Sequence, residues 1–157
     1  MSGTPAITAL ERSGVEFAEH SYEVVDPRGE TFGAAVADAL GVERSRVFKT
    51  LVARVDGDPV VAIVPVTGTL STKALAGARG AKRAAMADPG DAERLTGYVV
   101  GGISPFGRRR RLPVVADRSV LEHDTVFVSA GRRGLQVEVA PADLLALTGA
   151  TTAAIAT

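Results

Sequence analysis

The sequence VFKTLVARV at residues 47–55, followed by DGDP at 56–59 and VVAIVPV at 60–66, carries the clearest structural signal in the chain. Both apolar runs are rich in β-branched residues, which favour extended strands. The four residues between them have the composition of a tight turn. The stretch therefore predicts a β-hairpin.

Short helical and short strand patterns flank this hairpin on both sides. Helices are expected at 5–13, 32–40, 71–78, 89–96 and 141–147. A cap and an early proline mark the starts at 5 and 89, and a glycine follows the first four ranges. Strands are expected at 17–23, 82–85, 98–100, 112–116, 125–129 and 135–139. Because hairpins occur and the alternation is irregular, we expect an α+β fold in which short helices cover a mixed, curled or barrel-like β-sheet.

Length and composition favour one domain over residues 1–157. The chain has no internal repeat or linker-like tract, and its 46% hydrophobic residues can fill one core. It has no cysteine, which excludes disulfides, thiolate metal ligands and a cysteine nucleophile. Neither a signal segment nor a membrane-length apolar run is present, so we expect a cytoplasmic protein with no membrane partner.

The charges balance overall but cluster locally. Eighteen basic and eighteen acidic residues cancel, so any contact with nucleic acid must be local. The densest basic run is Arg108, Arg109, Arg110 and Arg111, and Arg132 and Arg133 follow on a separate turn. These arginines either bind RNA phosphates or form solvated loops.

Familiar catalytic motifs are absent from the sequence. His20 and His123 are the only imidazoles, and neither has the spaced partners that a zinc site needs. The chain has no Gly-x-Ser-x-Gly elbow and no phosphate-binding glycine loop. We therefore expect no metal and no cofactor, and a reaction that needs little help from protein side chains.

Two features remain as candidate sites. Lys49 is a charge in an apolar strand, and it either reaches out to water from a sheet face or holds a phosphate, a ribose or a developing oxyanion. The GGISPFG loop at 101–107 is either a plain strand exit or a place where backbone N–H groups approach a ligand. Tyr22 and Phe32 either stack on a terminal adenine or belong to the core.

Further short motifs are spread across nearly the whole chain. They are Thr4-Pro5-Ala6, His20-Ser21-Tyr22, Phe32-Gly33, Phe48-Lys49-Thr50-Leu51, Met86-Ala87-Asp88-Pro89, Thr96-Gly97-Tyr98, Gly101 to Gly107, Arg110-Arg111-Leu112-Pro113, and Val128-Ser129 with Gly131 to Leu135. In this order they resemble the YbaK-type family of aminoacyl-tRNA deacylases, which is similar to the editing domain inserted in bacterial prolyl-tRNA synthetases.

The resemblance implies a mixed α/β fold around a curled sheet and an enzyme that hydrolyses mischarged tRNA in trans. The branch most resembled removes cysteine from proline tRNA, and the thiol of the substrate attacks its own carbonyl to release a cyclic thiolactone. The implied partners are the aminoacylated tRNA 3′ end and prolyl-tRNA synthetase. The alternatives are a deacylase for another mischarged tRNA, such as Ala-tRNA(Pro), and a non-catalytic module that binds tRNA or a synthetase.

The resemblance also assigns roles to residues. Lys49 matches the family's essential lysine, which is expected to hold the tRNA 3′ end and stabilise negative charge. Gly101 and Gly102 are expected to offer backbone contacts to the ester. The positions expected to bind substrate are Tyr22, Phe32, Thr50, Ser104 and Ser129. Ala130 departs from the pattern, because glycine is common there.

Overall fold

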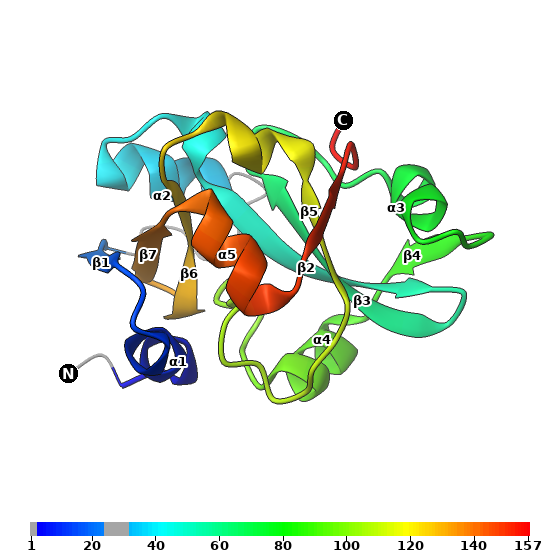
Figure 1. The fold of residues 1–157 in the computed structure, drawn as a ribbon, viewed down its shortest axis with the longest axis horizontal. Coiled ribbons are helices and arrows are strands. Elements are labelled where there is room, and N and C mark those ends of the chain that lie inside the picture. The colour runs from blue at the N-terminus through cyan, green and yellow to red at the C-terminus, as the bar shows by residue number, and fades with distance from the viewer. Residues whose placement is uncertain (1–2, 24–31) are drawn as a thin grey trace.

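The computed structural model describes residues 3–23 and 32–157, without the side chains of residues 32–34. Within these ranges, short helices surround two β-sheets (Figure 1). The helices are α1 (Pro5–Ser13), α2 (Phe32–Leu40), α3 (Thr72–Ala78), α4 (Pro89–Thr96) and α5 (Pro141–Thr148), and the strands are β1 (Phe17–Ser21), β2 (Phe48–Val55), β3 (Asp58–Pro65), β4 (Ala84–Met86), β5 (Val114–Asp117), β6 (Val126–Arg132), β7 (Leu135–Val139) and β8 (Thr151–Ala153).

The predicted hairpin is confirmed as the centre of the larger sheet. β2 and β3 pair antiparallel, with Val52 opposite Val61, in a sheet of strand order β4-β2-β3-β5-β8. β5 pairs parallel to β3, and β8 pairs parallel to β5, so this sheet is mixed. Asp56 and Gly57 both have positive φ, of 48° and 89°, which is the backbone of a tight hairpin turn.

The smaller sheet is antiparallel, with the order β1-β7-β6. A single parallel bridge, between Val47 and Phe127, joins it to the start of β2. Two sheets meeting at one bridge confirm the predicted α+β class with a mixed sheet. They do not close into a barrel within the part of the chain that the structure describes.

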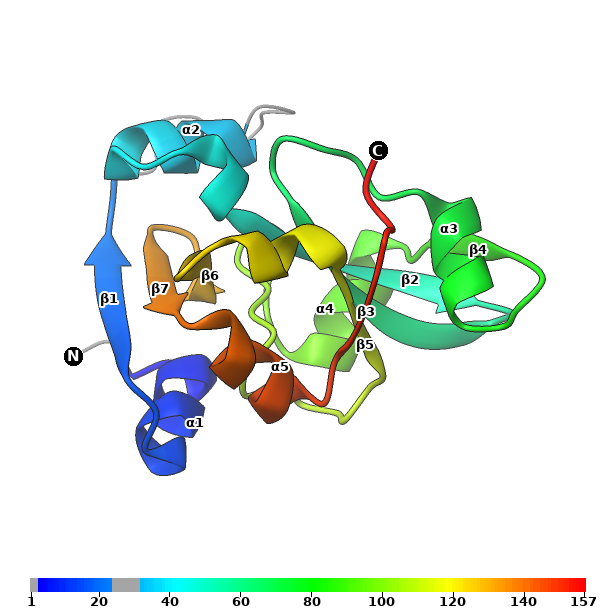
Figure 2. The ribbon, with the colours of Figure 1, turned by 45° about the horizontal axis from the view of Figure 1, so that its top comes forward.

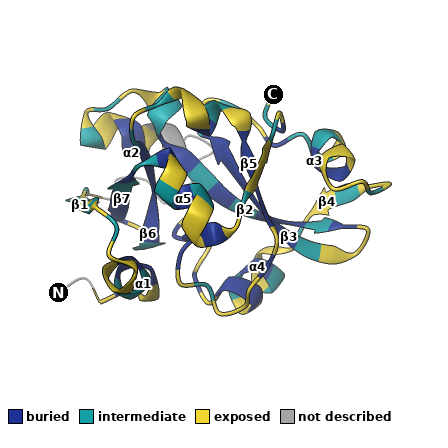
Figure 3. Ribbon diagram, viewed as in Figure 1, coloured by how far each residue is buried: buried dark blue, intermediate teal, exposed yellow. Residues whose placement is uncertain are grey.

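Side-chain alternation along β2 divides the apolar interior. Phe48 and Val52 face the largest cluster, which α1, α4 and the smaller sheet enclose. Ala53 and Val55 face a second cluster beneath α3. A third and smaller cluster lies beneath α2 around Phe127. Figure 3 shows the central strands dark with burial and the outer helix faces exposed.

All five predicted helices are confirmed to within one residue at each end. Thr4 caps α1 as its sequence predicts, because its hydroxyl accepts from the Ile7 N–H at 3.2 Å. β1 ends two residues before the predicted boundary, and β4 lies at Ala84–Met86 rather than at 82–85. In the described residues, no helix is long and apolar enough to span a membrane.

The predicted strand at 98–100 is wrong. Tyr98 is buried, and its hydroxyl donates to the Phe106 carbonyl at 2.6 Å, which ties it into the following loop. The Gly102 N–H then donates to the Val99 carbonyl at 2.9 Å, as in a turn. The prediction also missed β8 and two short 3₁₀ turns, Arg44–Arg46 and Arg118–Glu122.

Candidate functional site

Lys49 lies near the start of β2, on the face opposite Phe48. It stands opposite Val64 of β3, whose side chain belongs to the cluster beneath α3. Its side chain is half-buried, and this burial lowers the pKa of its ammonium. It forms no hydrogen bond or ion pair with any residue that the structure describes. Lys49 is therefore a partly desolvated cation that has no partner among the residues the structure describes.

The bridge between the two sheets puts Ser129 and Lys49 on the same face of the protein. Val47 and Phe127 pair in parallel, and side chains alternate along a strand, so the residues two positions onward, Lys49 and Ser129, point to the same side as this pair. Ser129 pairs with Gln136 of β7, so Gln136 lies on the same face, one strand further along the smaller sheet. We call these three side chains the polar row.

Buried polar atoms near this row lack partners. Among the described residues, the Gln136 Oε1 and the Tyr22 hydroxyl are buried and form no hydrogen bond. Tyr22 packs on the small cluster around Phe127, so it lies on the same face as the row. The Thr50 hydroxyl is also buried and unpaired, but alternation turns it to the opposite face of β2. Such orphaned groups cost stability unless a ligand completes them.

Sequence reasoning missed Gln136. Its signal resembles that of Lys49, because a polar residue interrupts the apolar strand LQVEV. An alternating polar residue normally indicates a solvent-facing position, yet only 5% of Gln136 is exposed. Its burial, and not its type, makes it a candidate for substrate contact.

A network of charged and polar side chains surrounds Glu138, two residues beyond Gln136 on the same face of β7. The Glu138 carboxylate accepts from the Thr125 hydroxyl, from His20 Nε2 at 2.9 Å and from Arg46 at 3.2 Å. Hydrogen bonding by Thr125, followed by that of His20, lowers the pKa of Glu138 despite the opposing effect of burial. The Arg46 guanidinium also lies 4.9 Å from the centre of the Phe127 ring. These contacts hold the sheet rigid beside the polar row.

The loop at 101–107 packs tightly on the β6–β7 turn. A Cβ on Gly102 would lie 2.8 Å from the Arg132 Cα, so the approach requires glycine. The Gly102 N–H is already used in the turn to Val99, whereas the Gly101 N–H makes no hydrogen bond with any described residue. Of the two glycines predicted to contact the ester, Gly101 has the available amide.

The other predicted substrate residues are placed differently. Ser104 is fully buried, and its hydroxyl accepts from the Phe106 N–H at 3.2 Å, so it shapes the loop. The Ser129 hydroxyl accepts from the Gly131 N–H at 3.2 Å. Phe32 begins α2, and its side chain lies outside the described part of the chain.

The six predicted RNA-binding arginines divide into two groups. Arg108 donates to the carbonyls of Pro105 and Leu112, at 3.0 and 3.1 Å, and Arg133 donates to Val100 at 2.6 Å. These two arginines stabilise loops. The exposed arginines Arg109, Arg110, Arg111 and Arg132 pair with no carboxylate in the described structure.

Comparison with known proteins connects this arrangement to a family. Residues 26–147 match the model of the aminoacyl-tRNA editing domain. Over 155 residues, the chain is 37% identical to EbsC of Enterococcus faecalis, a protein named for deacylation of Cys-tRNA(Pro) and Cys-tRNA(Cys). That alignment covers 98% of this chain and 93% of EbsC.

Two further similarities agree with this match. The chain is 31% identical over 144 residues to ProXp-y of Escherichia coli, named as a multifunctional Ser/Thr-tRNA deacylase, with 88% of this chain and 83% of that protein covered. A crystal structure described as a trans-editing enzyme for prolyl-tRNA synthetase superposes with a TM-score of 0.86 at 25% identity. The superposition covers 99% of this chain and 97% of that structure.

Proposed function

Because the chain belongs to the aminoacyl-tRNA editing domain family, we propose that it is a trans-acting deacylase whose substrate is Cys-tRNA(Pro), the product of an error by prolyl-tRNA synthetase. One observation carries the proposal. Lys49, which we match to the family's lysine, is a half-buried ammonium with no partner among the described residues, and it shares its face with buried polar atoms that likewise lack partners there. The 3′ end of an aminoacylated tRNA can supply hydroxyl, amino and carbonyl groups to complete them.

Lys49 acts electrostatically in this proposal. When the ester carbonyl is attacked, negative charge develops on its oxygen, and a fixed ammonium stabilises that charge. Partial burial strengthens the effect, since less water competes for the cation. The Gly101 amide, which donates to no residue that the structure describes, is the second donor that we assign to the ester.

The attacking group is the thiol of the substrate. Its sulfur bonds to the carbonyl carbon while the bond from that carbon to the ribose oxygen breaks. The thiol proton passes to the departing ribose oxygen, so tRNA leaves with a free hydroxyl and cysteine leaves as a cyclic thiolactone, which water then opens. No base is hydrogen-bonded to the Ser129 hydroxyl among the described residues, which supports a nucleophile from the substrate.

The experiment is a deacylation panel with the purified protein. Cys-tRNA(Pro), Ser-tRNA(Pro), Ala-tRNA(Pro) and S-methylcysteinyl-tRNA(Pro) are supplied at equal concentration, and release of the amino acid is measured. We expect cysteine to be released at least tenfold faster than serine, and alanine and S-methylcysteine to stay attached.

Each other result identifies a different function. Equal release of serine and cysteine would favour the second candidate, a deacylase for hydroxyl amino acids, which the similarity to ProXp-y supports. Preferential release of alanine would exclude the thiol mechanism. No release from any substrate would identify a binding module.

A further inference from the structure

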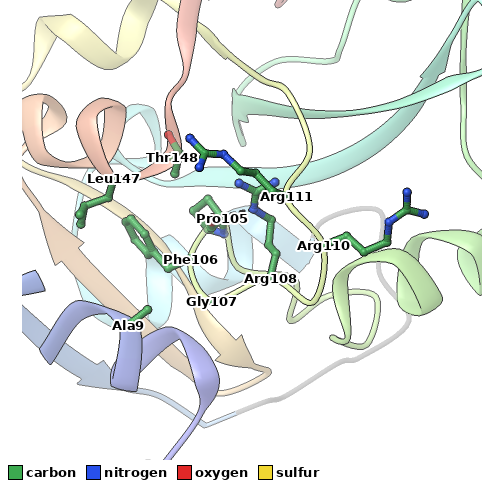
Figure 4. Close-up of a pocket in the computed structure, with 9 residues that line it drawn as sticks. All are labelled: Ala9, Pro105, Phe106, Gly107, Arg108, Arg110, Arg111, Leu147 and Thr148. Atoms are coloured by element: carbon green, nitrogen blue, oxygen red, sulfur yellow. Dashed lines mark hydrogen bonds between the residues drawn. The ribbon is translucent and has the colours of Figure 1, made fainter. Parts of the chain in front are cut away.

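A hollow of about 300 Å³ lies behind the loop at 101–107, between the loop, α1 and the end of α5. Its wall includes Phe106 and Leu147 as apolar members and three arginines as charged members, Arg108, Arg110 and Arg111. Figure 4 shows Arg108 and Arg111 extending toward Pro105 and Thr148, whereas Arg110 points away from them.

These two arginines hold like charges close together. Burial lowers the pKa of the Arg108 guanidinium, and the nearby charge of Arg111 lowers it further. Arg108 cannot move away, because its Nε and one terminal nitrogen donate to Pro105 and Leu112. Its other terminal nitrogen makes no hydrogen bond in the described structure, so it remains free to donate to a ligand.

No carboxylate of the described residues neutralises this pair. Elsewhere the chain pairs its arginines with acids, as in Arg44 with Asp38 at 2.8 Å and Arg54 with Asp91 at 2.8 Å. The carbonyl end of α5 offers partial negative charge nearby. However, none of the three arginines donates to a carbonyl of that helix, and Leu144 and Leu145 accept from Thr148 and Ala150 instead.

We propose that this hollow binds a phosphate group through Arg108 and Arg111. The guanidinium fork of Arg111 matches the oxygens of a phosphate, and the remaining terminal nitrogen of Arg108 adds one more donor from the same loop. The phosphate belongs to the tRNA backbone, and this part of the inference rests on the proposed function. Inorganic phosphate presents the same chemistry and is the second source.

The test compares Arg111→Ala with Arg79→Ala. Arg79 is exposed at the end of α3, at the opposite end of the molecule from α1 in Figure 2, so the control loses the same charge far from the hollow. Binding of sodium phosphate is measured by calorimetry against sodium chloride of equal ionic strength. Binding of uncharged tRNA(Pro) is measured over a series of salt concentrations.

We expect Arg111→Ala to weaken phosphate and tRNA binding by about tenfold, and to reduce the salt dependence of tRNA binding by about one unit of slope. Arg79→Ala should bind both ligands as the wild type does. Loss of phosphate binding with unchanged tRNA binding would assign the site to free phosphate. Unchanged binding of both ligands in Arg111→Ala would overturn the proposal.

Uncharged tRNA cannot be deacylated, so this result is independent of turnover. A protein that binds phosphate at Arg111 but releases no amino acid would refute the deacylase proposal and support the phosphate site. A protein that deacylates normally and binds no phosphate would support the deacylase proposal and refute the phosphate site.

Discussion

The polar row and the surroundings of Asp117 differ in how many hydrogen bonds their buried polar groups form. The Asp117 carboxylate is 7% exposed, and it accepts from the Ser119 hydroxyl and from three backbone N–H groups, those of Ser119, Ile155 and Ala156. Burial acts to raise its pKa, but these hydrogen bonds outweigh burial and leave the pKa lowered. In the polar row, by contrast, Lys49 and Gln136 have groups without a partner among the described residues, as does the neighbouring Tyr22 hydroxyl.

This difference in hydrogen bonding indicates a structural role for Asp117 and a binding role for the polar row. The chain can satisfy a buried charge completely where that charge only joins β5 to the C-terminal segment. A bound substrate would supply partners for the unpaired groups on the Lys49 face. Two other buried groups without partners among the described residues lie elsewhere: the Thr50 hydroxyl on the opposite face of β2, and the Nε2 of His123, whose ring packs against Phe48. Substitutions in the two regions should separate activity from stability.

The largest effect is expected from Lys49→Ala. Loss of the ammonium should lower kcat/KM for Cys-tRNA(Pro) by about 100- to 1,000-fold, because a donor to the developing oxyanion disappears. The melting temperature should stay the same or rise slightly, since Lys49 has no partner to lose among the described residues. The matched control is Lys73→Ala, an exposed lysine on α3, which should keep full activity. A Lys49→Ala protein with normal turnover would remove the lysine from the site.

Asp117→Ala should lower stability and leave activity unchanged, the reverse of Lys49→Ala. Losing the acceptor of four hydrogen bonds should lower the free energy of unfolding by about 3 kcal/mol, and the melting temperature by about 6–12 °C. The rate per folded molecule should not change. Thermal unfolding followed by circular dichroism, with deacylation at a temperature where both proteins are folded, checks both statements.

The stabilisation by Asp117 should also depend on pH. Its folded pKa lies below the ordinary value of 3.8, so the advantage over Asp117→Asn is complete above pH 3.8 and disappears as pH falls through the folded pKa. Urea unfolding of both proteins between pH 7 and pH 2 measures this difference. An advantage that grew in acid would contradict the assignment.

Gly102→Ala tests how closely the loop must approach the β6–β7 turn. The new Cβ would meet the backbone of Arg132 at 2.8 Å, so the loop must shift. Since small displacements of catalytic groups are costly, we expect kcat/KM to fall by about thirtyfold. Gly90→Ala, where a Cβ meets nothing within 4 Å, is the control and should leave activity unchanged.

Gln136→Leu should give the smallest effect. The substitution removes a buried acceptor that has no partner among the described residues, so the protein should be equally stable or more stable by up to about 1 kcal/mol. Deacylation should fall by about tenfold if the amide contacts the substrate. A loss of stability without loss of activity would place Gln136 with Asp117 as a structural group.

Local patterns explain what the sequence could predict. The β2–β3 hairpin was predictable because its strands and its Asp56-Gly57 turn lie within one short segment. Lys49 was a visible candidate because a charge interrupts that segment. Its neighbours depend on a bridge between Val47 and Phe127, which are far apart in sequence, so no local pattern reveals them.

The sequence-based predictions that were wrong or incomplete also involve contacts that no local pattern reveals. Residues 98–100 have strand composition, but a hydrogen bond from Tyr98 to Phe106 turns the chain. β8 is short and mostly exposed, and the Asp117 carboxylate holds the segment that follows it. Gln136 looks like a surface residue until the rest of the fold covers it.

The pKa of Lys49 tests the central claim most directly. It can be measured from the ¹³Cε resonance as pH is raised, first in the free protein and then with a stable amide analogue of 5′-phosphorylated cysteinyl adenosine at saturation. We expect a pKa below the ordinary 10.5 in the free protein and a clear rise on binding, because the analogue supplies the acceptor that the ammonium lacks. Identical titrations with and without bound analogue would contradict the claim that Lys49 anchors the substrate.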